Sequence, residues 1–187
     1  QRRGGRLQPE FQHAGQSLFT MTSGLRSVRD KTLTYVDDVL RTDETVRDRL
    51  CQFVNLFGDQ MRRVKQEDGP SLESTNYAFN MHAIIGGKLS ADESPRLFYV
   101  YPEGNWIEAA FDSPYFIIGR TYYGKPILDR LLTRDISLRA AIALALLAFD
   151  ATRTSVTDVD YRIDVAVLAN HANSPVFQRF SEAELQA

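Results

Sequence analysis

The first segments of the chain show two different spacings of hydrophobic side chains. Residues 16–23 alternate small polar with apolar side chains as far as Gly24, a pattern that predicts a strand ending in a glycine turn. Apolar residues then recur at steps of three and four positions from Leu25 to Leu40, which is the spacing of one helix face. The chain is therefore predicted to pass from a strand directly into an amphipathic helix.

A second helical stripe follows, with hydrophobic side chains at helical spacing over residues 46–64 and charged side chains on the other faces. Thr42 or Asp43 is its predicted cap, since both residue types accept hydrogen bonds from free helix N–H groups. Gly69-Pro70 is its predicted end, because proline lacks the N–H group that a continuing helix needs.

The middle of the chain is rich in β-forming residues interrupted by turn residues. Four strands are predicted there, over residues 76–88, 96–101, 106–111 and 115–118. The segments between them carry Gly, Pro, Asn and Ser, which favour short links between antiparallel strands. We therefore expect an antiparallel meander.

Two more helices and a strand are predicted in the last third of the chain. Pro126 suits the first turn of a helix that reaches Leu132. Ser137 can cap the next helix, over residues 138–151, which is apolar on nearly every face and is expected to lie buried between layers. Residues 161–169 have the pattern of a final strand.

The order of these elements is typical of an α+β protein, since the helices come in pairs and the strands in runs. Two stacked sheets with a helix pair on each outer face would bury every amphipathic surface. The predicted architecture is therefore a four-layer αββα sandwich. We expect a single domain over residues 1–169, followed by a polar C-terminal tail over residues 170–187.

Composition narrows the range of partners and compartments. The 187 residues carry a formal net charge of −2, so neither nucleic acid nor an anionic membrane is an expected partner. No apolar run approaches the roughly 18 residues of a membrane span. The single cysteine, Cys51, excludes an internal disulfide framework and fits a reducing compartment, so we expect a cytoplasmic protein.

Metal, phosphate and thiol chemistry find little support in the sequence. His13, His82 and His171 lie far apart without the spacing of metal ligands, and no metal or other cofactor is expected. Residues 86–88, Gly-Gly-Lys, lack the pattern of a phosphate-binding loop. Cys51 lies on the second predicted helix between the apolar residues Leu50 and Phe53, which favours a buried thiol over a nucleophile.

Two stretches of the sequence resemble one protein family. Residues 116–130 include Tyr-Gly-Lys-Pro-Ile-Leu-Asp-Arg and closely resemble a stretch of the bacterial proteasome-like proteins called Anbu (ancestral beta subunit). Residues 96–109, Arg-Leu-Phe-Tyr-Val-Tyr-Pro-Glu-Gly-Asn-Trp-Ile-Glu-Ala, are similar to another stretch of the same family. Residues 21–24 and 163–168 match more loosely and stand in the right order. The resemblance spans residues 6–169.

This resemblance implies the αββα fold of the Ntn hydrolases, which agrees with the element order. It also implies a peptidase or amidase of threonine type, in which an N-terminal Thr, Ser or Cys attacks the amide bond of a peptide or polypeptide substrate. Such subunits assemble into homo-oligomers, either a ring or an open helical turn. Because this chain begins at Gln1, we expect the nucleophile on a preceding segment and residues 1–187 alone to be inactive. An ATP-dependent partner is left open.

The resemblance also assigns residues to the site. It places the backbone N–H that stabilises the oxyanion at Gly24, with Thr22 and Ser23 beside the specificity pocket. From the residues alone, Gly24 could equally be a turn glycine between strand and helix. Counting back from Gly24 places the catalytic lysine of the family at Arg6. A guanidinium stays protonated, so Arg6 can supply only a fixed positive charge, or it belongs to a solvated basic end.

Two later loops are implied to orient the amine of the nucleophile. They map to Arg120 or Thr121, and to Ser155 and Asp158, although such residue types are also common in ordinary turns. The alternative function is a catalytically silent structural or assembly subunit of the same fold. It is motivated by Arg6 at the lysine position and by a chain without the nucleophile.

Overall fold

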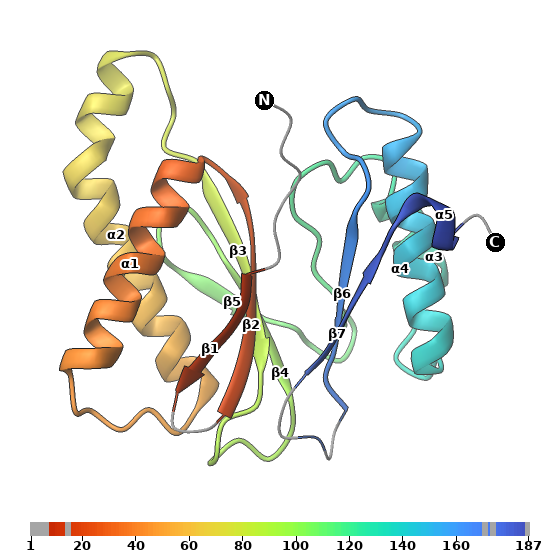
Figure 1. Ribbon diagram of the computed structural model, residues 1–187, viewed down its shortest axis with the longest axis horizontal. Helices are drawn as coiled ribbons and strands as arrows, with labels where there is room; N and C mark the ends of the chain where they lie inside the picture. Colours follow the sequence, from red (N-terminus) through yellow and green to blue (C-terminus); the bar gives the residue numbers. More distant parts are fainter. Residues whose placement is uncertain (1–7, 14–15, 170–171, 173–174, 186–187) are drawn as a thin grey trace.

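The computed structural model describes residues 8–13, 16–169, 172 and 175–185 of the chain. These residues form four layers, in the order helix pair, five-stranded sheet, two-stranded sheet and helix pair (Figure 1). The predicted α+β fold, a four-layer αββα sandwich, is confirmed.

The elements follow one another as follows. The first helical layer holds α1 (Arg26–Thr42) and α2 (Leu50–Ser74). The five-stranded antiparallel sheet has the strand order β1-β2-β3-β4-β5, with bounds Gln8–His13, Gln16–Gly24, Met81–Gly87, Arg96–Val100 and Trp106–Glu108. The second sheet pairs β6 (Ile163–Val167) with β7 (Val176–Phe180). The outer layer holds α3 (Lys125–Leu131) and α4 (Leu138–Arg153), and the short α5 (Glu182–Leu185) follows β7.

The main hydrophobic core lies between the five-stranded sheet and the helices α1 and α2. Strand alternation turns every second side chain of β3 toward these helices, and Met81, Ala83 and Ile85 are fully buried there. Apolar side chains at helical spacing on α1 and α2 fill the other side. The cluster also includes Leu18, Val28, Val36, Leu50, Phe53, Val54, Leu56, Phe57, Met61, Val64, Leu89, Phe98 and Val100.

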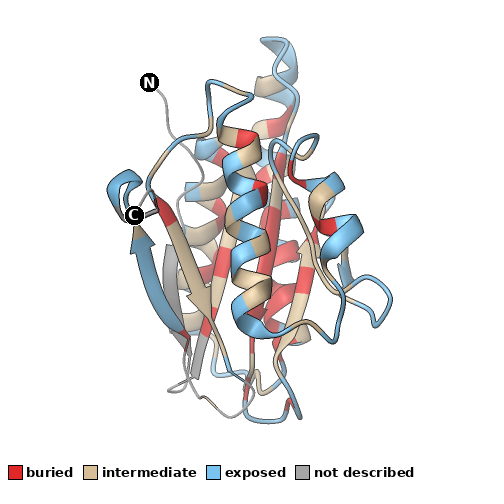
Figure 2. Ribbon diagram, turned by 90° about the vertical axis from the view of Figure 1, so that its right-hand side faces the viewer, coloured by how far each residue is buried: buried red, intermediate tan, exposed pale blue. Residues whose placement is uncertain are grey.

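The layer that contains α4 is packed less completely. Ala148 and Thr152 are the buried residues of this helix, while Leu147 is 50% exposed. Figure 2, seen from the side of α3 and α4, shows that buried residues concentrate in the deeper layers. The expectation that this apolar helix lies buried between layers is therefore wrong for the described part of the chain. The described part of the second sheet has only two strands, which cannot cover a helix of 16 residues.

The second helix begins later than predicted. Thr42 is the last residue of α1, and Asp43 is the C-cap of that helix. The Asp43 carboxylate accepts hydrogen bonds from the hydroxyl and N–H groups of Thr45, which lower its pKa to about 2. Asp43 thus stabilises a local turn, and α2 begins only at Leu50, whose N–H donates to the buried carboxylate of Asp92.

The same helix also continues beyond its predicted end. Gly69-Pro70 lies inside α2, which reaches Ser74. Pro70 is exposed, so the carbonyl oxygen that loses its helical partner can be hydrated instead. Leu72 packs against the core from the additional turn, which favours continuing the helix past the proline.

Two further segments differ from the predictions. Residues 115–118 were predicted as a strand and form a loop instead. Residues 176–180, within the predicted polar tail, form β7, which pairs with β6 along its whole length. The side chains of β7 are mostly exposed, so its sequence lacks the hydrophobic alternation by which a strand is predicted. Backbone hydrogen bonding to β6 therefore holds these residues in a strand.

The close approach of α2 to the turn before β5 gives a test of packing. Gly58 lies in the middle of α2, and a Cβ atom added there would overlap the backbone carbonyl oxygen of Gly104. The substitution Gly58→Ala is expected to lower the free energy of unfolding by about 1–3 kcal/mol, as overpacking does. This loss opposes the gain of about 1 kcal/mol that Ala normally brings to a helix. Urea unfolding followed by circular dichroism measures it.

Gly69 provides the matched control in the same helix. The nearest atom to an added Cβ at Gly69 is Cγ of Lys65, at 3.9 Å, which is an ordinary contact. Gly69→Ala is therefore expected to raise the unfolding free energy by up to about 1 kcal/mol. Stabilisation by both substitutions would contradict the tight contact at Gly58.

Candidate active site

The end of β2 turns sharply into α1 at Gly24. The φ angle of Gly24 is +124°, which favours glycine, and a Cβ atom there would overlap the backbone carbonyl of Asn80. The N–H of the next residue, Leu25, donates to the same Asn80 oxygen at 2.8 Å. The turn is thus fixed against the residue that precedes β3, and only glycine fits it. Gly24 is exposed, so its backbone is accessible to a substrate.

The two residues before Gly24 face opposite sides of the sheet. Thr22 pairs with Ala83, whose side chain is buried against the helices, whereas Ser23 pairs with His82 on the face toward the second sheet. The family resemblance predicts Thr22 and Ser23 beside one pocket. Strand alternation separates them, so each can line only its own side of the β2 end.

A loop from the other half of the chain lies against Ser23. Gly119 has a φ angle of +86°, and a Cβ atom added to it would lie 3.5 Å from the Ser23 hydroxyl oxygen. Three residues earlier, the ring of Phe116 contacts the ring of Tyr99 on β4, with centroids 5.6 Å apart. These two contacts hold the segment 116–121 over the inner face of the five-stranded sheet, close to the Gly24 turn.

An ion pair joins this segment to the loop after α4. The Arg120 guanidinium binds both carboxylate oxygens of Asp158, with N···O distances between 2.8 and 3.2 Å. Hydrogen bonding to Arg120 lowers the pKa of the Asp158 carboxyl, which therefore stays ionised at neutral pH. Both side chains are about half exposed, so solvent weakens the attraction between them. The pair brings together two loops that are 38 residues apart in sequence.

The remaining residues predicted for these loops have local hydrogen-bond partners. The Thr121 carbonyl oxygen accepts the N–H of Lys125, and its side chain is half-buried at the start of α3. The Ser155 hydroxyl donates to the Ala151 carbonyl at 2.8 Å and so finishes the last turn of α4. Arg6 lies outside the described residues.

Two residues that shape this site, Gly119 and Arg120, carry only a weak signal in the sequence. Gly119 is not among the residues predicted for the site, yet its positive φ angle lets the loop approach Ser23. Arg120 was named only as an alternative to Thr121, yet it makes the contact with Asp158. An isolated glycine after the apolar residues 115–118 was the available signal, since such a glycine often marks a special backbone conformation.

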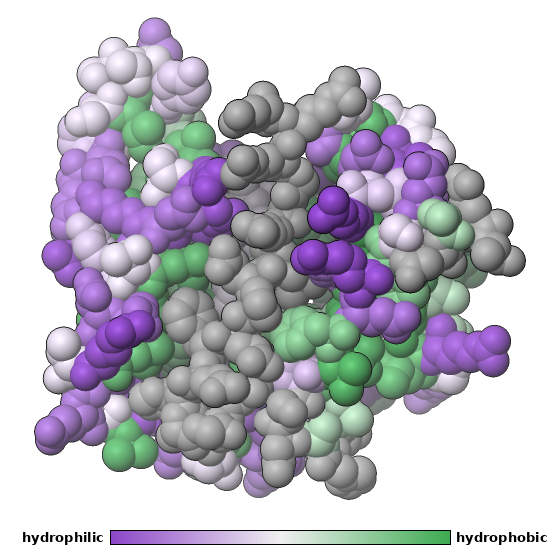
Figure 3. All heavy atoms as spheres, in the orientation of Figure 1, coloured by the Kyte–Doolittle hydropathy of each residue, from purple (hydrophilic) through white to green (hydrophobic). Residues whose placement is uncertain are grey.

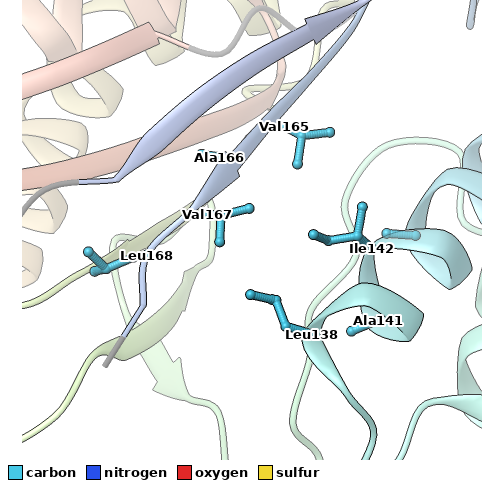
Figure 4. Close-up of a pocket in the computed structure, with 8 residues that line it drawn as sticks. Leu138, Ala141, Ile142, Val165, Ala166, Val167 and Leu168 are labelled. Atoms are coloured by element: carbon cyan, nitrogen blue, oxygen red, sulfur yellow. The ribbon is translucent and has the colours of Figure 1, made fainter. Parts of the chain in front are cut away.

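An apolar cleft opens between α4 and β6. It has a volume of about 280 Å³, and Leu138 and Ile142 of α4 face Val165 and Val167 of β6 across it (Figure 4). Figure 3 shows hydrophobic residues gathered on the half of the surface that carries β6 and β7, whereas the side of α1 and α2 is mainly hydrophilic. Among the described residues β6 pairs only with β7, so its second edge has no strand partner there.

The described part of the chain shows no group of three or more His, Cys, Asp or Glu side chains that could hold a metal ion. Within the same residues, no helix is both long enough and apolar enough to cross a membrane.

The pKa of Asp158 tests whether Arg120 is its partner in solution. Replacing Arg120 with Ala removes the cation, so the Asp158 pKa is expected to rise toward its ordinary value. Since the folded-state pKa lies below the unfolded one, the pair stabilises the fold above the unfolded pKa of Asp158. That stability is lost as the pH falls through the folded pKa. An NMR titration of the Asp158 carboxyl carbon in both proteins measures the change.

The exposed pair between Arg41 and Asp37 on α1 offers a control. Arg41→Ala removes a similar contact on the opposite layer and is expected to leave the Asp158 titration unchanged. An Asp158 pKa that is the same with and without Arg120 would show that the pair does not form in solution.

Comparisons with known proteins agree on one family. A family model described as proteasome subunit matches residues 61–168. A search of curated proteins found no match. Among solved structures, a Gly-1 mutant of Anbu from Hyphomicrobium sp. strain MC1 is 30% identical, with a TM-score of 0.83. The match covers 97% of this chain and 75% of that one.

Two other solved structures are similar to the same extent. Anbu (ancestral beta-subunit) from Yersinia bercovieri is 28% identical with a TM-score of 0.84, and the match covers 96% of this chain and 76% of that one. The structure described as the helical assembly of the Anbu complex from Pseudomonas aeruginosa is 28% identical with a TM-score of 0.85, over 94% of this chain and 74% of that one. This chain therefore belongs to the proteasome family, in its Anbu (ancestral beta subunit) branch.

Proposed function

We propose that this chain is a subunit of a self-compartmentalising peptidase or amidase that hydrolyses amide bonds in peptides or polypeptides. Its nucleophile is an N-terminal Thr, Ser or Cys on a segment that precedes Gln1 in the complete polypeptide. One observation carries the proposal: the Gly24 turn, the loop 119–121 and the Asp158 loop meet at the end of β2. This arrangement supports the proposal because it brings a candidate oxyanion donor at Gly24 near candidate acceptors on the two loops.

The proposed chemistry divides between the nucleophile and this chain. The α-amine of the first residue, with an ordinary pKa of about 8, takes the proton of its own hydroxyl or thiol. The attack converts the substrate carbonyl to an oxyanion, and the backbone N–H of the exposed residue Gly24 is proposed to stabilise that negative charge. Arg6 would supply a fixed positive charge near the nucleophile, without accepting a proton.

The proposed orientation of the amine depends on acceptors from two loops. Asp158 is kept ionised by Arg120, so its carboxylate can accept an N–H bond from the amine. The Thr121 and Ser155 hydroxyl oxygens are further acceptors, and Ser155 retains that capacity while donating to Ala151. Thr22 and Ser23, on opposite sides of β2, are proposed to contact different parts of the substrate.

The segment that is proposed to precede Gln1 can lie in the cleft beside β6. An extended apolar strand along the edge of β6 that has no partner among the described residues would pair its backbone with that edge and cover Leu138, Ile142 and Ala145 of α4. Leu138 is 57% exposed in this chain. Covering these three side chains would give α4 more of the burial that its apolar sequence predicts.

The complete gene product provides the direct test. Its mature first residue is identified by mass spectrometry and then replaced with Ala, and hydrolysis of fluorogenic peptides is measured. The wild-type protein is expected to cleave peptides and to react with a covalent probe that needs both the α-amine and the adjacent hydroxyl or thiol. The Ala variant is expected to lose at least 99% of this activity, because removing a catalytic nucleophile typically costs more than about a thousandfold.

The assembled state of each protein is the control, since an Ala variant that assembles normally has lost only chemistry. Full hydrolysis by that variant, or a mature chain without Thr, Ser or Cys at its start, would contradict the proposal. An assembled wild-type particle that neither labels nor hydrolyses would instead identify a silent structural or assembly subunit.

Self-assembly is the second part of the proposal. One relative is described as a helical assembly of the Anbu complex from Pseudomonas aeruginosa, and a homo-oligomer, whether a ring or an open helical turn, is proposed for this protein. Head-to-tail contacts between identical subunits produce either form, depending on whether the rotation closes. The proposed compartment is the cytoplasm, where the free thiol of Cys51 stays reduced.

Residues 1–187 alone are expected to associate, because one edge of β6 has no strand partner in the described part of the chain and an apolar cleft lies beside it. Light scattering at increasing protein concentration measures the mean mass. Leu138→Lys places a charge at the cleft and is expected to lower the mean mass. Thr34→Lys, at an exposed position of α1, is expected to leave the mean mass unchanged. A concentration-independent monomer for the unmodified chain would contradict the expectation.

A further inference from the structure

Three polar side chains lie together on the inner face of the five-stranded sheet. The register of β2 and β3 places Ser23 opposite His82, and Tyr99 of β4 shares their face. The Tyr99 hydroxyl oxygen lies 2.8 Å from Nδ1 of His82, which is hydrogen-bond distance. The tilted rings of this pair have centroids 5.7 Å apart. None of these side chains has a role in the fold of the main core, which lies on the other face of the sheet.

The bond between Tyr99 and His82 joins two uncharged groups. Burial lowers the pKa of His82, against the opposing effect of the Glu103 carboxylate, and burial also raises the pKa of Tyr99. At neutral pH the imidazole is therefore neutral and the phenol protonated. Either the phenol donates to Nδ1, or Nδ1–H donates to the phenol oxygen, and each tautomer fixes both rings. The effect of the bond is thus on orientation and not on charge.

Segment 116–121 of the candidate active site contacts this group of three side chains at two points. At one end, the Phe116 ring contacts the Tyr99 ring, with 5.6 Å between centroids. At the other end, the Gly119 backbone approaches Ser23, whose hydroxyl oxygen would lie 3.5 Å from a Cβ atom at Gly119. Tyr99 also packs against Tyr101, with centroids 4.7 Å apart, which supports its ring from the side.

We propose that His82 and Tyr99 are positioning residues, which hold segment 116–121 at its distance from the Gly24 turn. The hydrogen bond fixes the Tyr99 ring, this ring seats Phe116, and the segment then carries Arg120 and Thr121 to the end of β2. The assignment of catalytic consequences rests on the proposed function, whereas the positioning itself does not.

The substitution Tyr99→Phe removes the hydroxyl and keeps the ring, so packing against Phe116 survives while the bond to His82 is lost. In the complete protein, amide hydrogen exchange of segment 116–121 is expected to speed up about fivefold, which is the effect of one neutral hydrogen bond. Exchange in α1 and α2 is expected to stay unchanged. Peptide hydrolysis is expected to show kcat lowered about fivefold with KM unchanged, because the substrate-facing residues of β2 are not altered.

His82→Gln is the second variant, since the amide can still bond to the Tyr99 hydroxyl and so partly preserve the segment. His82→Phe removes the bond from the other side and is expected to match Tyr99→Phe. The double variant His82→Phe, Tyr99→Phe is expected to show the same change in exchange rate and kcat as either single variant. Both substitutions remove the same interaction, so the second removes nothing more. Additive effects of the two substitutions would overturn the proposed pairing.

The matched control is Tyr35→Phe, which loses one hydroxyl bond of similar length, 2.7 Å to Glu67, between α1 and α2. It is expected to change neither the exchange of segment 116–121 nor kcat. If the wild-type protein hydrolyses no peptide, the proposed function fails while the exchange measurement still decides the positioning role. Unchanged exchange in Tyr99→Phe, in a protein that is otherwise active, would overturn the positioning role alone.

Discussion

The turn at Gly24 is the constraint on which both the fold and the candidate site depend. Its positive φ angle brings the backbone against Asn80, and the N–H of Leu25 then bonds to the Asn80 carbonyl. That single arrangement ends β2, starts α1 and fixes the register of β2 against β3, since Asn80 directly precedes β3. A residue with a side chain could not make the turn. The position of the proposed oxyanion site therefore follows from the same steric requirement that joins the sheet to its helical layer.

The two halves of the sandwich are completed to different degrees. α1 and α2 present a charged outer surface with ion pairs such as Arg26–Asp30 and Arg63–Glu67, and they bury a continuous apolar face against five strands. α4 also has an apolar face, but this face packs against only two described strands, and Leu138 stays exposed. Apolar surface of this kind is stabilised only by a further contact. The second sheet is therefore where additional chain, or another subunit, has most to contribute.

Much of this fold could be predicted from hydrophobic spacing, because α1 and the β3–β4 pair have strong patterns that their packing satisfies. The errors arose where one residue type serves two purposes. Asp43 has the sequence signature of a helix N-cap but closes a local turn with Thr45. Pro70 has the signature of a helix end but lies inside α2, at an exposed position. The strand β7 escaped prediction because backbone pairing with β6, rather than its own side chains, defines it.

The candidate site could be predicted only in part, and the reason is physical. The turn at Gly24 is encoded locally by a glycine between a strand and a helix pattern. By contrast, Arg120 and Asp158 are 38 residues apart, and the chain has many other arginines and carboxylates with which each could pair. Only the three-dimensional arrangement selects one pair. Ser23 and His82 likewise become neighbours only through the strand register, which sequence periodicity does not determine.

The ion pair between Arg120 and Asp158 cannot by itself hold the loop in place. Both side chains are about half exposed, and exposed pairs contribute little to stability in water. The hydrogen bond that the Ser155 hydroxyl donates to Ala151 stays at the end of α4 and does not join the two loops. A fixed distance between the loop and Gly24 therefore requires contacts shielded from solvent. The part-buried bond between His82 and Tyr99, together with the ring of Phe116, meets that requirement on the face where the loop rests. The exposed ion pair between Arg120 and Asp158 then needs only to orient charge. The uncharged pair of His82 and Tyr99 determines the position of the loop.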